Sequence, residues 1–136
     1  MGTIFIVDDD IDDHHIYRSV LNELGIMNDI MDFFSAQDAF EFISKKEVFP
    51  SIIFSDINMN GMNGFDLKKK ILNDPDLRSK CIPFIFLTTG GENKTLWENY
   101  EDNVQGLFIK PPSIEEWKTL LKKIMDYWDS SKKPAY

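Results

Sequence analysis

Five short apolar runs recur along this chain, and an amphipathic stretch follows each of them. Short runs rich in β-branched and aromatic residues are typical of strands buried on both faces, whereas apolar residues three or four positions apart indicate helices. Strands that alternate with helices predict an α/β fold with a parallel sheet covered on both sides. The expected strands are Thr3–Val7, Asp29–Phe34, Ser51–Ser55, Ile82–Thr88 and Val104–Ile109.

Helix signals fill the segments between the runs. Ser113 and Glu116 have the spacing of a capping box, and Ser35 and Asp12 are placed to cap two earlier helices. Pro75 is expected to end a helix. The helices are expected after Asp12 up to Leu24, over Ala36–Lys46, Gly64–Asn73 and Glu92–Glu101, and from Ile114 to Trp128.

Length and charge restrict the class of protein. A chain of 136 residues predicts one domain, which we place at residues 1–129, followed by a polar tail at 130–136. The net charge of −8 argues against binding to nucleic acids or anionic membranes, and no apolar run is long enough to span a bilayer. The single cysteine, Cys81, cannot form an internal disulfide, which suits a reducing compartment such as the cytoplasm.

Polar residues stand at the ends of four expected strands. Asp8 and Asp9 follow the first strand, Asp56 the third, Thr88 ends the fourth and Lys110 follows the fifth. The carboxyl ends of parallel strands share one edge of a sheet, where α/β proteins bind ligands. Clustered carboxylates suit a hard divalent cation such as Mg²⁺, and lysine and threonine suit a phosphate. The set therefore predicts phosphoryl transfer, with an aspartate able to accept the group.

Four motifs occur in a diagnostic order: I-V-D-D-D, S-D-I-N-M-N-G-M-N-G, F-L-T-T and F-I-K-P. With them the chain resembles the receiver domain of two-component response regulators, from about Thr3 to Trp128. The resemblance implies a (βα)₅ flavodoxin-like fold, a doubly wound parallel sheet with strand order 2-1-3-4-5.

The resemblance also implies the chemistry of the strand ends. Asp56 would accept a phosphoryl group from a histidine kinase or a phosphotransfer protein. Asp8, Asp9, Asp56 and the main-chain carbonyl of Asn58 would bind Mg²⁺. The protein would then be a phosphorylation switch rather than an enzyme, although it could catalyse its own dephosphorylation.

Two further residues complete the implied site. Thr88 would hydrogen-bond the phosphoryl group and Lys110 would pair with it, aimed by a cis peptide bond before Pro111. Phosphorylation would change the face formed by the helix 92–101, the strand 104–109 and the last helix. A downstream protein would bind that face.

The chain departs from the family pattern at three positions. Asn60 stands where a proline is usual, and Pro112 where a large apolar residue is commoner. Leu107 replaces the aromatic residue that usually couples phosphorylation to the signalling face. Phe108 is adjacent but should point to the other side of its strand.

Other residues near the site have simpler interpretations. We expect Asp10, Asp12 and Asp13 to form a solvated helix start. Neighbouring side chains on a helix point in different directions, so His14 and His15 are expected at the surface or against a partner rather than on a metal.

Two alternative functions remain open at this stage. An aspartyl phosphatase of the haloacid-dehalogenase type also uses an aspartate at a strand end. Such an enzyme needs a second acidic residue two positions later, where this chain has Asn58. A receiver-like interaction module that never uses phosphate is the other alternative, because Leu107 and Asn60 depart from the pattern.

Overall fold

The fold is a five-stranded parallel sheet, described by a computed structural model at residues 2–89 and 106–131. The strand order is β2-β1-β3-β4-β5. This confirms the predicted flavodoxin-like topology. The strands are β1 (Thr3–Val7), β2 (Ile30–Phe33), β3 (Pro50–Ser55), β4 (Phe84–Thr88) and β5 (Gly106–Ile109).

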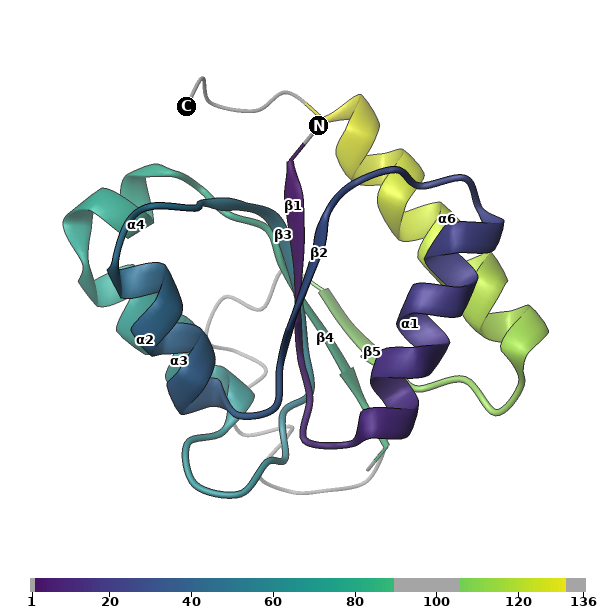
Figure 1. Cartoon of the computed structure of the whole chain (residues 1–136), viewed down its shortest axis with the longest axis horizontal. Helices are drawn as coiled ribbons and strands as arrows, with labels where there is room; N and C mark the ends of the chain where they lie inside the picture. The colour runs from purple at the N-terminus through teal and green to yellow at the C-terminus, as the bar shows by residue number, and fades with distance from the viewer. Residues whose placement is uncertain (1, 90–105, 132–136) are drawn as a thin grey trace.

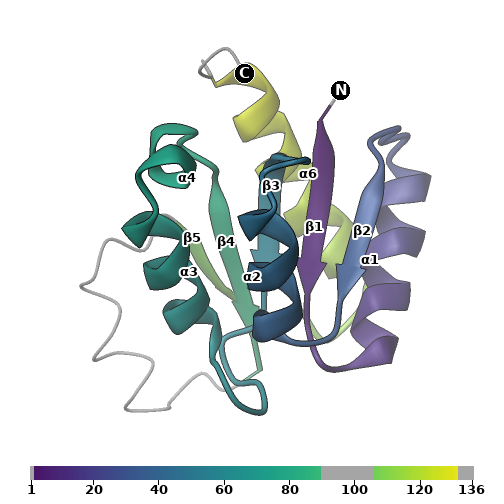
Figure 2. The same cartoon turned by 60° about the vertical axis from the view of Figure 1, so that its left-hand side comes forward.

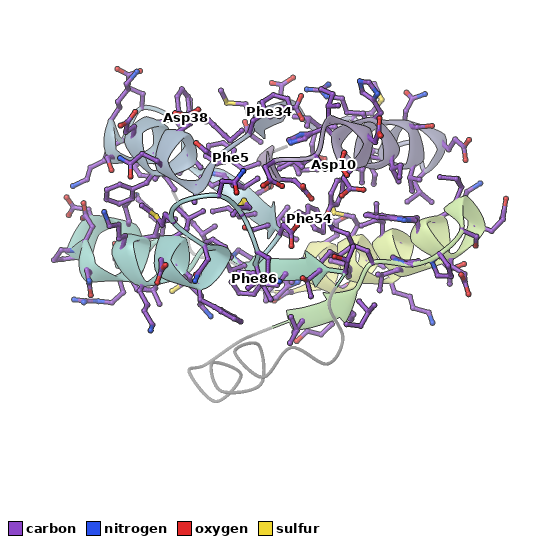
Figure 3. All side chains as sticks on the ribbon, turned by 90° about the horizontal axis from the view of Figure 1, so that it is seen from below. Phe5, Asp10, Phe34, Asp38, Phe54 and Phe86 are labelled. Carbon is purple, nitrogen blue, oxygen red and sulfur yellow. The ribbon has the colours of Figure 1, made fainter. Side chains whose placement is uncertain are left out.

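Helices cover both faces of the sheet, with α2, α3 and α4 on one side and α1 and α6 on the other (Figure 1). Alternate residues along each strand supply two separate cores. Phe5 and Phe86 belong to the core under α2 and α3, and Phe54 to the core under α1 and α6 (Figure 3). The helices are α1 (Ile11–Glu23), α2 (Ala36–Ser44), α3 (Gly64–Asn73), α4 (Pro75–Ser79) and α6 (Ile114–Ser130).

Two helix predictions need correction. Pro75 ends α3 as expected, but it also begins α4, a short helix that the sequence analysis missed. Proline suits the first turn of a helix because its missing N–H would be unpaired there, and Asp74 caps that turn. Asp10, not Asp12, caps α1 by accepting a hydrogen bond from the backbone N–H of Asp12. The expected helix Glu92–Glu101 lies outside the described residues.

The carboxyl ends of the strands lie together at one edge of the sheet. The turn after β1 and the loop after β3 both lie at this edge, on the opposite side of the molecule from the C-terminal end of α6 (Figure 1). In the turned view, α2 and α3 lie in front of the sheet and α1 and α6 lie beside and behind it (Figure 2). No helix in the described ranges is long and apolar enough to cross a membrane.

Candidate functional site

Asp56 is fixed at the end of β3 by its own backbone and by its neighbours. Its N–H donates to the carbonyl of Val7 at 2.9 Å, which ties the residue to the end of β1. One carboxylate oxygen accepts the N–H of Ile57 at 2.7 Å, and the other accepts Lys110 at 3.1 Å. The residue is 7% exposed, so most of it is shielded from solvent.

Asp8 and Asp9 bring two more carboxylates to the same place. Ligand atoms of Asp8, Asp9 and Asp56 all lie within 4.8 Å of one another. Asp8 is buried, and the N–H of Asp10 donates to its Oδ1 at 2.9 Å, whereas Asp9 is exposed. Three carboxylate oxygens at this spacing leave room for one hard cation between them. The donor set therefore fits Mg²⁺ or a similar ion.

Lys110 is the positive charge that the structure places in this cluster. Its side chain is 6% exposed, and its Nζ donates to Asp8 at 2.8 Å, Asp13 at 2.6 Å and Asp56 at 3.1 Å. Its backbone N–H donates to the carbonyl of Thr88 at 2.8 Å, which extends the pairing of β4 and β5 to the site. Residues 8, 56 and 110 thus meet as predicted, from three strands separated along the chain.

The carboxylates outnumber the ammonium, and the pKa values reflect both burial and this imbalance. Burial raises the pKa of Asp8 from 3.8 to about 6, although hydrogen bonds from Lys110 and from the N–H of Asp10 lower it. Burial lowers the pKa of Lys110, but its hydrogen bonds to Asp13 and Asp8 outweigh burial and hold that pKa well above its usual range. Lys110 is therefore charged, and ionisation of Asp8 is unfavourable in the metal-free protein.

The pKa of Asp8 predicts how stability depends on pH without metal. A carboxyl group whose pKa is raised on folding binds its proton more tightly in the folded state, so stability falls as pH rises through that range. A rise of about two pKa units corresponds to roughly 3 kcal/mol of unfolding free energy, which is lost progressively between about pH 4 and pH 6 and is not recovered at higher pH. Urea unfolding in EDTA across this range should show the loss in the wild type.

The matched pair for this pH series is Asp8→Asn and Asp12→Asn. Asp8→Asn should remove most of the loss, while Asp12→Asn should retain it because Asp12 is exposed. Equal pH profiles for the wild type and Asp8→Asn would contradict the assignment.

Two glycines shape the loop that follows Asp56. Gly61 has a φ of 80°, a left-handed conformation that favours glycine. Gly64 is the first residue of α3 and lies against the main chain of Asp56. An added Cβ at Gly64 would collide with the carbonyl oxygen of Asp56. Within the motif S-D-I-N-M-N-G-M-N-G, Gly61 is therefore needed for a tight turn and Gly64 for a close approach of two backbone segments.

Thr88 and Asn58 flank the cluster. The Thr88 hydroxyl is fully buried and has no hydrogen-bond partner in the described part of the chain. A buried unpaired hydroxyl is costly, and a ligand oxygen at the site would satisfy it. Asn58 is exposed in the loop after β3. Its proposed role as a carbonyl ligand stays a prediction.

Comparisons with known proteins place the chain in one family. The response regulator receiver domain family matches residues 4–122. The chain belongs to this family. Chemotaxis protein CheY-3 of Vibrio cholerae is 29% identical over 123 residues, which cover 90% of this chain and 91% of that relative.

Two solved structures share the receiver fold. The Mn²⁺-bound response regulator Rcp1 has a TM-score of 0.83 at 22% identity, covering 99% of this chain and 100% of that one. The phosphorylated cyanobacterial phytochrome response regulator RcpA has a TM-score of 0.85 at 20% identity, covering 98% and 99%. At these identities the likeness concerns the fold, and the site of this receiver domain has to be judged from its own residues.

Two residues that we expected at the surface are instead part of the receiver site. Asp13 is not a solvated carboxylate, because it forms the shortest of the three contacts to Lys110. His14 is 1% exposed, and its ring nitrogens lie 2.7 Å from Asp32 and 2.7 Å from the main-chain carbonyl of Asp8. The packing of α1 on the sheet turns both side chains inward. Asp13 stands four residues, about one turn of helix, before the buried Tyr17, and this spacing was the signal available in the sequence for its inward position.

In and after β5, the structure contradicts the expected cis bond before Pro111 and confirms the expected orientations of Leu107 and Phe108. The described peptide bonds are all trans, so the expected cis bond before Pro111 is wrong. The long side chain of Lys110 reaches its three acceptors from a trans bond. Leu107 packs against the α2–α3 core and Phe108 against the α1–α6 core, which confirms that they point to opposite sides of β5.

Proposed function

We propose that this receiver domain accepts a phosphoryl group on Asp56 in a reaction that requires Mg²⁺. The observation that carries the proposal is the cluster itself, in which Asp8, Asp9 and Asp56 gather within 4.8 Å and Lys110 contacts Asp56. Receiver domains as a class bind Mg²⁺ or Mn²⁺ at an acidic pocket and are phosphorylated by histidine kinases. The donor would be a histidine kinase or a phosphotransfer protein.

The chemistry follows from the positions of the side chains. An Asp56 carboxylate oxygen forms a bond to phosphorus while the phosphorus–nitrogen bond of the donor phosphohistidine breaks, and the imidazole leaves with the electron pair. A bound divalent ion supplies positive charge beside the phosphoryl oxygens. Asp8, Asp9, Asp56 and the carbonyl of Asn58 would hold it. Lys110 and the hydroxyl of Thr88, which has no partner among the described residues, would bond the phosphoryl oxygens.

The acyl phosphate would act as a switch for a partner protein. The hydroxyl of Thr88 would turn to the new oxygens, and the change would reach β5 through the backbone hydrogen bond that Lys110 donates to the Thr88 carbonyl. The partner surface would include β5 and α6; the helix expected at Glu92–Glu101, which the sequence-based prediction adds to this face, lies outside the described residues. The receiver boundary at residue 129 stays a prediction.

Phosphorylation can be measured directly. Incubation with acetyl phosphate and Mg²⁺ should add one phosphoryl group to the intact mass, and Asp56→Asn should add none. EDTA should abolish the gain in the wild type. Asp66→Asn is the matched control, since Asp66 is exposed in the first turn of α3. An equal gain in Asp56→Asn, or none in the wild type, would refute the proposal.

A further inference from the structure

The ammonium of Lys110 is fully occupied before any ligand arrives. A lysine ammonium has three hydrogens, and Nζ lies within hydrogen-bond distance of three carboxylates, those of Asp8, Asp13 and Asp56. An additional phosphoryl oxygen can bond this ammonium only when at least one of these contacts is released.

The three acceptors differ in what happens to them during the proposed reaction. Asp8 and Asp56 would be taken by the divalent ion, and Asp56 would also lose its full negative charge on becoming an acyl phosphate. Asp13 would neither bind the ion nor be phosphorylated. It lies in the first turn of α1, its side chain is 15% exposed, and its contact to Nζ is the shortest of the three at 2.6 Å.

The backbone holds Asp13 in place independently of the ligand. Asp10 caps α1, and one turn beyond Asp13 the ring of Tyr17 is packed between Phe54 and Trp117. Side chains four positions apart share a helix face, so the buried Tyr17 keeps the Asp13 side of α1 turned toward the sheet. The carboxylate of Asp13 can therefore stay beside Lys110 while the other two acceptors change partners.

We infer that Asp13 is a positioning residue that holds Lys110 in the site when the metal ion and the phosphoryl group engage Asp8 and Asp56. With Asp13 as its retained partner, the ammonium keeps its place and turns its two released hydrogens toward the phosphoryl oxygens. This inference rests on the proposed function, because it assigns Asp13 a role only in the metal-loaded and phosphorylated states.

The test follows the Lys110 ammonium by ¹H–¹⁵N NMR, with Lys110→Met identifying its signal. Spectra are recorded in EDTA and in saturating Mg²⁺ for the wild type, Asp13→Asn and Asp13→Ala. Asp12→Asn is the control, since it removes the same charge from the same turn at an exposed position. Alanine is a good helix former, so Asp13→Ala guards against a loss of α1.

The expected result is specific to the metal-loaded state. Interaction energies between residues of one charged network change an equilibrium constant about 2- to 150-fold. In Mg²⁺ we therefore expect the Lys110 ammonium hydrogens to exchange with water at least about threefold faster in both Asp13 variants than in the wild type. Asp12→Asn should match the wild type. Equal exchange rates in the wild type and both Asp13 variants, while Mg²⁺ still shifts the amides of Asp9 and Asp56, would overturn this inference alone. Absence of any Mg²⁺ shift would refute the proposed metal site, and this inference with it.

Discussion

Lys110→Met is expected to destabilise the metal-free protein by about 3–5 kcal/mol, because it leaves a group of carboxylates without their buried counter-charge. Nζ lies 2.6–3.1 Å from Asp13, Asp8 and Asp56, and Asp8 is ionised only at a cost even with the lysine present. The loss should be largest above about pH 6, where Asp8 would otherwise be charged. Urea unfolding in EDTA measures it.

Mg²⁺ separates an electrostatic cause from lost packing. An ion bound among the carboxylates supplies the missing positive charge, so Lys110→Met should gain more stability from Mg²⁺ than the wild type does. Lys122→Met is the matched control: Lys122 pairs with Asp126 on the exposed side of α6, and its loss should change stability by no more than about 0.5 kcal/mol. Wild-type stability of Lys110→Met in EDTA would show that the cluster does not need the lysine.

Gly64→Ala is expected to have the second large effect, on stability and on the site together. The added Cβ would collide with the Asp56 carbonyl and would lie 3.0 Å from the Phe86 ring and 3.1 Å from Ser55 Oγ. Relief requires β3 and α3 to separate, which should cost about 3 kcal/mol. Displacement of Asp56 should slow phosphorylation by acetyl phosphate at least about tenfold, since reacting groups tolerate little misplacement.

A second glycine distinguishes the two effects. Gly25→Ala puts an alanine into a left-handed backbone conformation just after α1, where φ is 74°. The added Cβ would meet nothing within 4 Å. The substitution should cost about 1–2 kcal/mol while leaving the phosphorylation rate unchanged, because it lies away from the strand ends. Urea unfolding and intact-mass kinetics on both variants make the comparison. Wild-type phosphorylation in Gly64→Ala would contradict the tight fit at Asp56.

The hydrophobic pattern of the sequence was sufficient to predict the five strands of the sheet, because buried parallel strands require continuous apolar runs. It was less informative at strand ends: β2 and β4 are shorter than the strands expected at Asp29–Phe34 and Ile82–Thr88, since ladder pairing rather than hydrophobicity decides where a strand begins and ends. The short α4 was missed because Pro75 was interpreted only as the end of a helix. The same proline also favours the start of one.

The sequence by itself determined which residues stand at the strand ends, and so predicted that Asp8, Asp9, Asp56, Thr88 and Lys110 would share one edge. It could do so because order along the chain and strand polarity are local properties. Only the tertiary structure decided which helix residues join them. Asp13 and His14 reach the site because α1 packs on the sheet with that face inward, and its rotation depends on contacts with β2, β3 and α6 made far away in the sequence.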